Sequence, residues 1–331
     1  MDLAQNGPRS TGKVVAVTGA TGFLGRRLVK VFAEQGWAEQ GWTIRLLARR
    51  DIADPAWLGL EPQLVIGDLA NTSALAMLCD GAEVVVHVAG LIKARSRAAF
   101  DRANVEGSRR VAQAAKAAGA RMILVSSLAA REPHLSDYAG SKRGAEDAAR
   151  EIIGGDLTIV RPPAIYGPSD IETFRLFKMA LNSPFLPVLD PKARMAWIHA
   201  DDAAAQIAHL VKMPRPGLLS LSDDRPEGYG WVELMQTASK AVGTSPRLIR
   251  IPAWTIKALA NLSKWASIAS GKDSILTPGK ARELLHGNWA LSSNDPIPDF
   301  PAVRYSLEAG FAQSVRWYRS EGWLKDKKSR E

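Results

Sequence analysis

Short apolar runs alternate with amphipathic stretches through the first half of the chain. The first run, Val14–Val17, ends in glycines and leads into a helical pattern, and later runs stand in "TIRLLARR", "QLVIGDL", "EVVVHVAG", "RMILVSSLAA" and "LTIVRPPAIYG". Continuous apolar strands separated by helices are typical of a parallel sheet that is buried on both faces. The pattern therefore predicts an α/β fold with a doubly wound parallel sheet and a ligand site at the carboxyl ends of the strands.

The alternation ends near Pro168, where prolines, tryptophans and short helical patterns take over. The segment "RMAWIHADDAAAQIAHLV" is interpreted as a return to the sheet, with Asp201 or Asp202 capping the helix that follows. Beyond it we expect a smaller, mostly helical C-terminal substrate domain that acts as a lid. The predicted boundaries are a tail at 1–12, a dinucleotide-binding domain at 13–167 rejoined by about 194–222, a lid at 168–193 and 223–325, and a basic tail at 326–331.

A glycine-rich turn joins the first predicted strand to the first predicted helix. Its glycines follow a Gly-x-x-Gly-x-x-Gly spacing. Glycine permits a tight turn and a close approach of backbone to ligand, and the unpaired N–H groups of a helix N-terminus attract a pyrophosphate. We predict that a dinucleotide binds here, through Thr18, Gly19, Thr21, Gly22, Phe23, Leu24 and Gly25.

The end of the second strand indicates which dinucleotide binds. An acidic residue at this place would bind the ribose 2′-hydroxyl of NAD(H), whereas an arginine would bind the 2′-phosphate of NADP(H). The chain has Ala48 there, followed by Arg49 and Arg50, and a planar guanidinium suits a phosphate. The sequence therefore favours NADP(H) over NAD(H).

The ends of the third and fourth strands add further candidate contacts to the cofactor. Asp68 and Leu69 end the third strand, where the carboxylate either accepts a hydrogen bond from the adenine amino group or serves as an ordinary turn aspartate. Ala89 and Gly90 end the fourth strand, where their small size leaves room for the cofactor.

Tyr138 and Lys142 lie four residues apart in the helical stretch "SDYAGSKRGAED", so they share one face of the predicted helix. A phenol with a pKa near 10 is a poor base at neutral pH and needs a nearby cation to stabilise its phenolate. Lys142 supplies that charge. Ser127, at the end of the fifth strand, can hydrogen-bond the reacting oxygen, and the adjacent Ser126 is an alternative for that role.

Composition and charge narrow the setting and the partners. The chain has 331 residues, and its single cysteine, Cys79, excludes an internal disulfide and a cysteine-based zinc site. We therefore expect a protein that resides in the reducing environment of the cytoplasm and holds no metal. No apolar run is long enough to cross a bilayer. The net charge of +9 predicts an anionic partner, either a phosphorylated cofactor or an acidic membrane surface. Nucleic acid is not expected, because neither a zinc-finger spacing nor an aromatic RNA-binding motif is present.

Taken in order, several motifs resemble those of the extended short-chain dehydrogenase/reductases, which include NAD(P)-dependent epimerases and dehydratases on a Rossmann fold. They are "TGATGFLG", "GDL", "VVHVAG", "NVEGS", "LVSSLAA", "YAGSK", "RPPAIYGP" and "WIHADD". The resemblance implies a catalytic set of Ser127, Tyr138, Lys142 and Asn104. It also implies that Pro162, Ala164 and Ile165 lie against the nicotinamide.

The branch of the family is indicated by "LLARR" and by a tryptophan-rich C-terminal region, which resemble the steroid and ketoceramide reductases and the accessory subunit of respiratory complex I. This resemblance implies an oxidoreductase that acts on a keto or secondary hydroxyl group of a small lipophilic substrate, such as a 3-ketolipid (a ketoceramide) or a steroid. A nucleotide-sugar epimerase or dehydratase, and a non-catalytic scaffold that holds NADP(H), are the alternatives. The chain is expected to be a monomer or a homodimer.

The segment "IPAWTIKALANLSKWASIASGK" predicts an amphipathic helix with an apolar stripe. Tryptophan and lysine around such a stripe are typical of a helix that lies in a membrane interface. The alternative is that the stripe packs into the lid or lines the substrate pocket. The stripe and its bordering lysines are Trp254, Ala258, Leu262, Trp265, Lys257 and Lys264.

Overall fold

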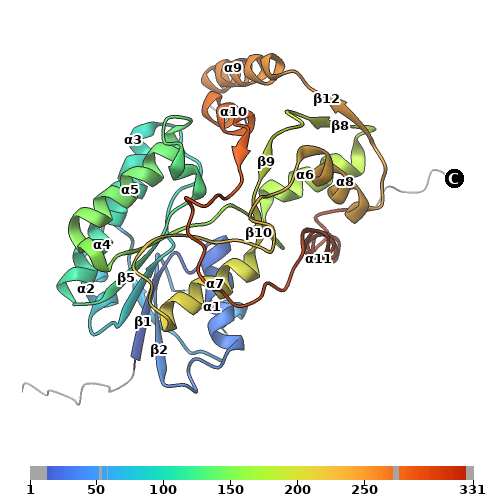
Figure 1. The fold of residues 1–331 in the computed structure, drawn as a ribbon. Coiled ribbons are helices and arrows are strands. Elements are labelled where there is room, and N and C mark those ends of the chain that lie inside the picture. The colour runs from blue at the N-terminus through green and yellow to red at the C-terminus, as the bar shows by residue number, and fades with distance from the viewer. Residues whose placement is uncertain (1–12, 52–53, 58, 271–275, 326–331) are drawn as a thin grey trace, which may run out of the picture.

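The computed structural model describes residues 13–51, 54–57, 59–270 and 276–325. Its centre is a seven-stranded sheet with the strand order β11-β6-β5-β4-β1-β2-β3, in which every pairing is parallel (Figure 1). The expected doubly wound α/β fold is confirmed. The strands are β1 (Lys13–Thr18), β2 (Trp42–Ala48), β3 (Gln63–Ile66), β4 (Val84–His87), β5 (Arg121–Val125), β6 (Thr158–Arg161) and β11 (Gly217–Ser220).

Helices cover both faces of the sheet, because successive residues of a buried strand point to opposite sides. Val15 and Val17 of β1 belong to one apolar cluster with residues of α1 (Phe23–Glu34) and α7 (Ala200–Lys212). Val14 and Ala16 belong to a second cluster on the other face. That face is covered by α2 (Thr72–Cys79), α4 (Gly107–Ala117) and α5 (Asp137–Ile153).

The predicted return to the sheet differs from the structure. Within "RMAWIHADD", β10 (Trp197–His199) pairs with β7 (Ala164–Tyr166) in a separate two-stranded sheet, and the seventh strand of the main sheet is β11. Pro162 and Pro163 separate β6 from β7, and proline has no N–H to continue a ladder, so the chain leaves the main sheet there and offers β7 to β10.

The cap of α7 also differs from the prediction. Neither Asp201 nor Asp202 is the capping residue, because His199 precedes the helix and its Nδ1 accepts a hydrogen bond from the backbone N–H of Asp201 at 3.2 Å. Both aspartates lie in the first turn of α7, where the positive end of the helix dipole favours negative charge.

The C-terminal region has an apolar core of its own, separate from the two that flank the sheet. The rings of Phe177 and Phe311 meet edge to face at its centre, with centroids 5.0 Å apart. This core is built from α6 (Ile171–Asn182), β8 (Phe185–Val188), α8 (Trp231–Val242), β12 (Arg247–Arg250) and α11 (Leu307–Ser320). The expected helical C-terminal part is thus confirmed, with short strands added.

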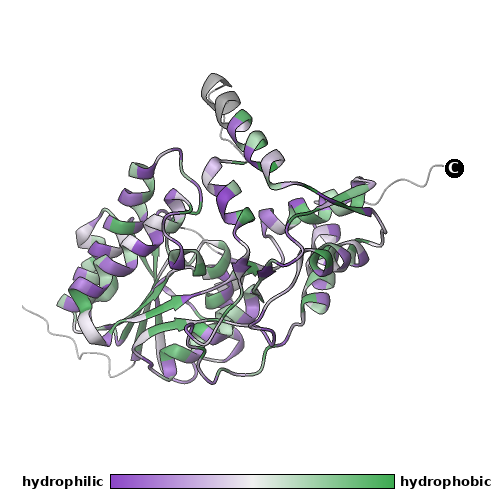
Figure 2. Cartoon of the chain, turned by 45° about the horizontal axis from the view of Figure 1, so that its top comes forward, coloured by the Kyte–Doolittle hydropathy of each residue, from purple (hydrophilic) through white to green (hydrophobic). Residues whose placement is uncertain are grey.

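The remaining elements are short or lie at the edge of the molecule. Two of them matter for the site: α10 (Pro278–Leu285) contacts α9 (Ala253–Ser270), which projects away from the body of the protein (Figure 2). In the described parts of the chain, no helix is both long and apolar enough to span a bilayer. The others are η1 (Pro55–Trp57), α3 (Arg97–Phe100), the π-helix η2 (Asp101–Glu106), η3 (Leu128–Arg131), η4 (Gly154–Asp156), β9 (Arg194–Met195) and β13 (Asn288–Trp289).

The apolar stripe of α9 does not pack into the lid where its side chains are described. Trp254 is 70% exposed and Leu262 is 67% exposed, and Ala258 and Lys257 between them are also exposed. The alternative that these residues pack inside the lid is therefore wrong. The side chains of Lys264 and Trp265 lie outside the described part of the chain.

Candidate active site

The glycine-rich turn fits a dinucleotide because each of its three glycines is needed for a close backbone approach. Gly19 has φ +74°, and a Cβ there would lie 2.6 Å from the backbone nitrogen of Ala89. A Cβ on Gly25 would lie 2.0 Å from the Gly19 carbonyl oxygen. Gly22 is the N-cap of α1 and offers no side chain to the first backbone N–H groups of that helix, which are left for an anionic group such as a pyrophosphate.

A buried hydrogen-bond chain supports this turn from behind. The Thr18 hydroxyl lies 2.6 Å from Nδ1 of His87, and Nε2 of His87 lies 3.0 Å from the Ser108 hydroxyl. Burial, reinforced by the charge of Lys142, lowers the pKa of His87 to about 3, so the imidazole is neutral at physiological pH. Thr18 also accepts a hydrogen bond from the Ala89 N–H, which links the ends of β1 and β4.

Arg49 and Arg50 directly follow β2 and are both exposed. Among the residues that the structure describes, neither guanidinium has a hydrogen-bonding or ion-pair partner, so both are free to meet a ligand. Since Leu47 of β2 pairs with Thr18 of β1, the two arginines lie close to the glycine-rich turn.

Asp68 is exposed and has a local structural task. One of its carboxylate oxygens accepts hydrogen bonds from the backbone N–H groups of Ala70 and Asn71, at 2.8 and 3.1 Å. The adjacent Leu69 packs against Gly107 of α4, where a Cβ would lie 2.8 Å from its side chain. Asp68 therefore stabilises the turn through Oδ1, and its Oδ2 is left for a ligand.

Ser127, Tyr138 and Lys142 come together at the carboxyl end of β5. The side chain of Ser127 lies near the Tyr138 hydroxyl, where it opposes the rise in the pKa of Tyr138 that burial causes. Lys142 is buried on the same helix, where its Nζ donates to the Val125 carbonyl at 2.8 Å. Burial lowers the pKa of Lys142 to about 8, and the negative charge of Glu146 partly opposes this shift.

Asn104 lies in the π-helix η2 and fixes the loop that follows β4. Its amide donates to the Leu91 carbonyl at 3.0 Å and to the Ser141 hydroxyl at 2.9 Å, and its oxygen accepts from the Leu91 N–H at 2.7 Å. A Cβ on Gly90 would lie 3.2 Å from the Asn104 oxygen and 3.8 Å from Nζ of Lys142. The single-turn π-helix, a feature often found at functional sites, thus brings Asn104 beside α5, the helix of Tyr138 and Lys142.

The predicted nicotinamide contacts follow β6. Pro162 is buried, and its carbonyl accepts a hydrogen bond from the Leu128 N–H at 2.8 Å, which places it next to Ser127. Ala164 is exposed and Ile165 is partly buried, both on β7. These residues therefore adjoin the same end of β5 as the Tyr138 hydroxyl.

The sequence analysis missed Glu146, which is fully buried one turn after Lys142. Its carboxylate accepts hydrogen bonds from Nε and Nη2 of Arg161 at 2.8 and 2.6 Å and from the Ser126 hydroxyl at 2.5 Å. Ser126 is thereby engaged away from Tyr138, while Ser127 faces it. The four-residue spacing from Lys142 to Glu146 was the available signal.

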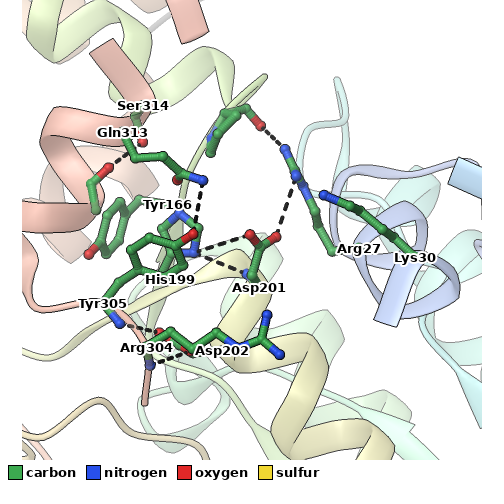
Figure 3. Close-up of polar contacts among 12 residues, drawn as sticks. Arg27, Lys30, Tyr166, His199, Asp201, Asp202, Arg304, Tyr305, Gln313 and Ser314 are labelled. Carbon is green, nitrogen blue, oxygen red and sulfur yellow. Dashed lines mark hydrogen bonds and ion pairs between the residues drawn. The ribbon is translucent and has the colours of Figure 1, made fainter. Parts of the chain in front are cut away.

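A second polar cluster, around His199, joins the sheet domain to the lid (Figure 3). Asp201 lies 3.4 Å from the Arg27 guanidinium of α1, and Arg27 also donates to the Pro168 carbonyl at 2.8 Å. The Asp202 carboxylate accepts from the backbone N–H groups of Arg304 and Tyr305 in the segment that leads to α11, at 2.8 and 3.2 Å. These contacts fix the lid relative to the sheet.

Comparison with known proteins places the chain in a family. Residues 15–219 match the model of the NAD dependent epimerase/dehydratase family. A ceramide reductase of Caulobacter vibrioides is 51% identical over 312 residues, which cover 94% of this chain and 96% of that protein. A 4-hydroxy-2-methyl-3-oxo-4-farnesyl-3,4-dihydroquinoline-1-oxide ketoreductase of Stigmatella aurantiaca is 32% identical over 64% of this chain and 65% of its own length.

Solved structures agree on the fold. The dTDP-glucose 4,6-dehydratase DesIV of Streptomyces venezuelae, with NAD and TYD bound, superposes with a TM-score of 0.68 at 21% identity, and the match covers 94% of this chain and 99% of that one. The chain belongs to the NAD-dependent epimerase/dehydratase family and is an NAD(P)-dependent oxidoreductase of the extended short-chain dehydrogenase/reductase type.

Proposed function

We propose that the protein uses NADPH to reduce a keto group on a lipophilic substrate of the 3-ketolipid class, namely a ketoceramide. The observation that carries this proposal is the convergence of Ser127, Tyr138 and Lys142 at the carboxyl end of β5, beside a turn that fits a dinucleotide. The ketolipid class is supported by the 51% identity with a protein named ceramide reductase. A steroid ketone is the nearest alternative substrate.

The side chains divide the reaction among them. Tyr138 donates its phenolic proton to the carbonyl oxygen, and Ser127 hydrogen-bonds the same oxygen and orients it. The positive charge of Lys142 stabilises the phenolate that remains, and Asn104 holds the surrounding backbone. A nicotinamide held beside Pro162, Ala164 and Ile165 would supply the hydride for the carbonyl carbon.

The preference for NADP(H) is also part of the proposal. Arg49 and Arg50 are exposed and free at the end of β2, where an acidic residue would otherwise bind a 2′-hydroxyl. Thr18, the glycine-rich turn and the small residues Ala89 and Gly90 would hold the rest of the cofactor. Asp68 would accept from the adenine with the carboxylate oxygen that the turn does not use.

The two alternatives are less well supported. A nucleotide-sugar epimerase needs a polar, diphosphate-binding lid, whereas Leu291 and Trp289 of this lid form an apolar cluster with Leu128, the residue that follows Ser127. A non-catalytic scaffold has no use for a tyrosine that lies beside a serine and has a buried lysine one helical turn away.

A substrate panel tests the proposal. Purified protein is mixed with NADPH or NADH and with a short-chain 3-ketoceramide, a 3-ketosteroid or a UDP-sugar, and loss of the reduced cofactor and formation of product are followed. We expect reduction of the ketoceramide with NADPH and no conversion of the UDP-sugar. Turnover of the UDP-sugar alone would reject the ketolipid assignment.

We propose further that α9 docks on an anionic membrane surface, where a ketolipid would be found. Trp254, Leu259 and Leu262 present exposed apolar area on α9, which projects from the body of the protein (Figure 2), and the exposed Lys257 lies on the same helix. An apolar stripe bordered by basic residues on a protein of net charge +9 complements a negatively charged bilayer.

A further inference from the structure

The helix α10 of the lid packs directly on the N-terminal end of α5, which carries Tyr138. The Ser136 hydroxyl donates to the carboxylate of Glu283 on α10, and the side chain of Arg282 donates to the Leu135 carbonyl at 2.7 Å. A Cβ on Gly279 would lie 2.9 Å from the Cβ of Ser136, so the two helices touch with no side chain between them. The catalytic helix is therefore in contact with the lid at the turn that presents the tyrosine.

Glu283 is held at the positive end of α5. Ser136 is the N-cap of that helix, since its hydroxyl oxygen accepts from the Ala139 N–H at 3.0 Å while donating to Glu283. The Glu283 residue is only 9% exposed, and its second carboxylate oxygen lies 3.4 Å from Nζ of Lys280. The helix dipole and the ammonium group both attract the carboxylate.

Tyr138 stands two residues after Ser136 and experiences the charge of Glu283. Its hydroxyl faces Ser127 from the end of β5, its ring faces Phe100 of α3 with centroids 6.1 Å apart, and Lys142 lies one turn further along α5. Exclusion of water raises the pKa of Tyr138, the neighbouring Ser127 hydroxyl lowers it, and the negative charge of Glu283 raises it again. Glu283 is the anionic group that acts on this phenol from the lid.

We propose that Glu283 is a positioning residue that couples the lid to the catalytic helix and keeps Tyr138 protonated over a wider pH range. A carboxylate beside a phenol disfavours the phenolate, and a protonated Tyr138 is the form that gives its proton to a ketone. The inference rests on the proposed function, because it assigns Tyr138 the role of acid. It also makes the protonation of Tyr138 dependent on the contact between α10 and α5.

The direct test follows the ionisation of Tyr138 without substrate or cofactor. The full chain is labelled with tyrosine carrying ¹³C at Cζ, and its NMR signals are titrated from about pH 8 to pH 12, since the pKa of Tyr138 lies above the ordinary value of about 10, with Tyr138→Phe identifying the signal. We expect Glu283→Gln to move the Tyr138 midpoint down by about one pH unit, because the substitution removes the charge and keeps the size. Glu308→Gln, on an exposed side chain of α11, should leave the midpoint unchanged.

Two further variants separate charge from contact. Glu283→Asp keeps the negative charge and should leave the midpoint closer to that of the unmodified protein than Glu283→Gln does. Lys280→Gln, at a 54% exposed side chain that tolerates substitution, removes the counter-charge and should move the midpoint upward even if Glu283→Gln does not fold. The proposal is overturned if Glu283→Gln titrates like the unmodified protein. If Glu283→Gln does not fold, an unchanged Tyr138 midpoint in Lys280→Gln overturns it instead.

Kinetics give a second readout. If the ketone reductase activity is present, its decline at alkaline pH should begin about one pH unit lower in Glu283→Gln than in the unmodified protein, with little change in kcat at pH 7. An equal loss of kcat at every pH would mean a merely structural role. Absence of ketone reduction by the unmodified protein would reject the proposed function, while the NMR titration would still decide the effect of Glu283 on Tyr138.

Discussion

At the scale of single residues, the proposed chemistry depends on the Tyr138 hydroxyl. Tyr138→Phe removes the transferable proton and keeps the ring that faces Phe100, so the shape of the site is preserved. We expect kcat for ketone reduction to fall by about 10²–10⁴ while the affinity for NADPH changes little. Steady-state kinetics and calorimetric titration with NADPH measure the two quantities. Near-normal turnover would remove Tyr138 from the catalytic set.

Cofactor choice is a second property of individual side chains. Replacing both Arg49 and Arg50 with alanine should weaken NADPH binding by about 2–3 kcal/mol, because charge-assisted hydrogen bonds to the 2′-phosphate are lost. NADH lacks that phosphate, so its affinity should hardly change. Calorimetry with each cofactor gives both values, and tighter binding of NADH than of NADPH by the unmodified protein would contradict the proposal.

Some site residues could be predicted from the sequence and others could not, for a physical reason. Tyr138 and Lys142 are one helical turn apart, so their spacing alone places them together. Glu146 has the same spacing from Lys142, but a glutamate in a helix is usually solvated, and its partner Arg161 lies on β6. Glu283 is even harder to predict from the sequence, since it lies 147 positions after Ser136 and only the folded C-terminal region brings the two together.

At the scale of elements, the apolar runs predicted six of the seven strands in the main sheet, because a strand buried on both faces must be apolar along its length. The seventh, β11 (Gly217–Ser220), was missed. The apolar segment around Ile198 resembles a strand of the main sheet as well as β11 does. An apolar pattern does not reveal which strand a segment will pair with. The two prolines after Arg161 decide the outcome by ending β6 there.

The contact between α5 and β6 makes a stability prediction. Glu146 and Arg161 are 0% and 7% exposed, so Glu146→Gln leaves a buried guanidinium without its counter-charge. We expect the free energy of unfolding to fall by about 3–5 kcal/mol, measured by urea denaturation. The matched control is Glu151→Gln on the same helix, whose 70% exposed side chain pairs with Arg109 and should contribute less than about 1 kcal/mol. Equal effects of the two substitutions would contradict the argument.

At the scale of the whole molecule, positive charge and an apolar projection occur together. The chain carries a net charge of +9, and α9 extends from the body next to α10, which in turn rests on the catalytic helix (Figures 1 and 2). A membrane contact through α9 would therefore bring the lid side of the active site toward the lipid. A bilayer is the natural source of a substrate that hardly dissolves in water.

Vesicle co-sedimentation over a salt series tests this contact. We expect binding to vesicles that contain anionic lipid and a steady loss with salt, because each basic residue near the surface contributes about 1 kcal/mol of screened attraction. Lys257→Glu should weaken binding most at low salt, whereas Trp254→Ala should weaken it at every salt concentration by removing apolar area. Lys116→Glu, on α4, is the control for net charge alone and should have a smaller effect than Lys257→Glu. Absence of binding to anionic vesicles at low salt would contradict the membrane contact. In that case α9 has another partner, such as a second copy of the chain. The ketolipid must then reach the site by diffusion or on a carrier.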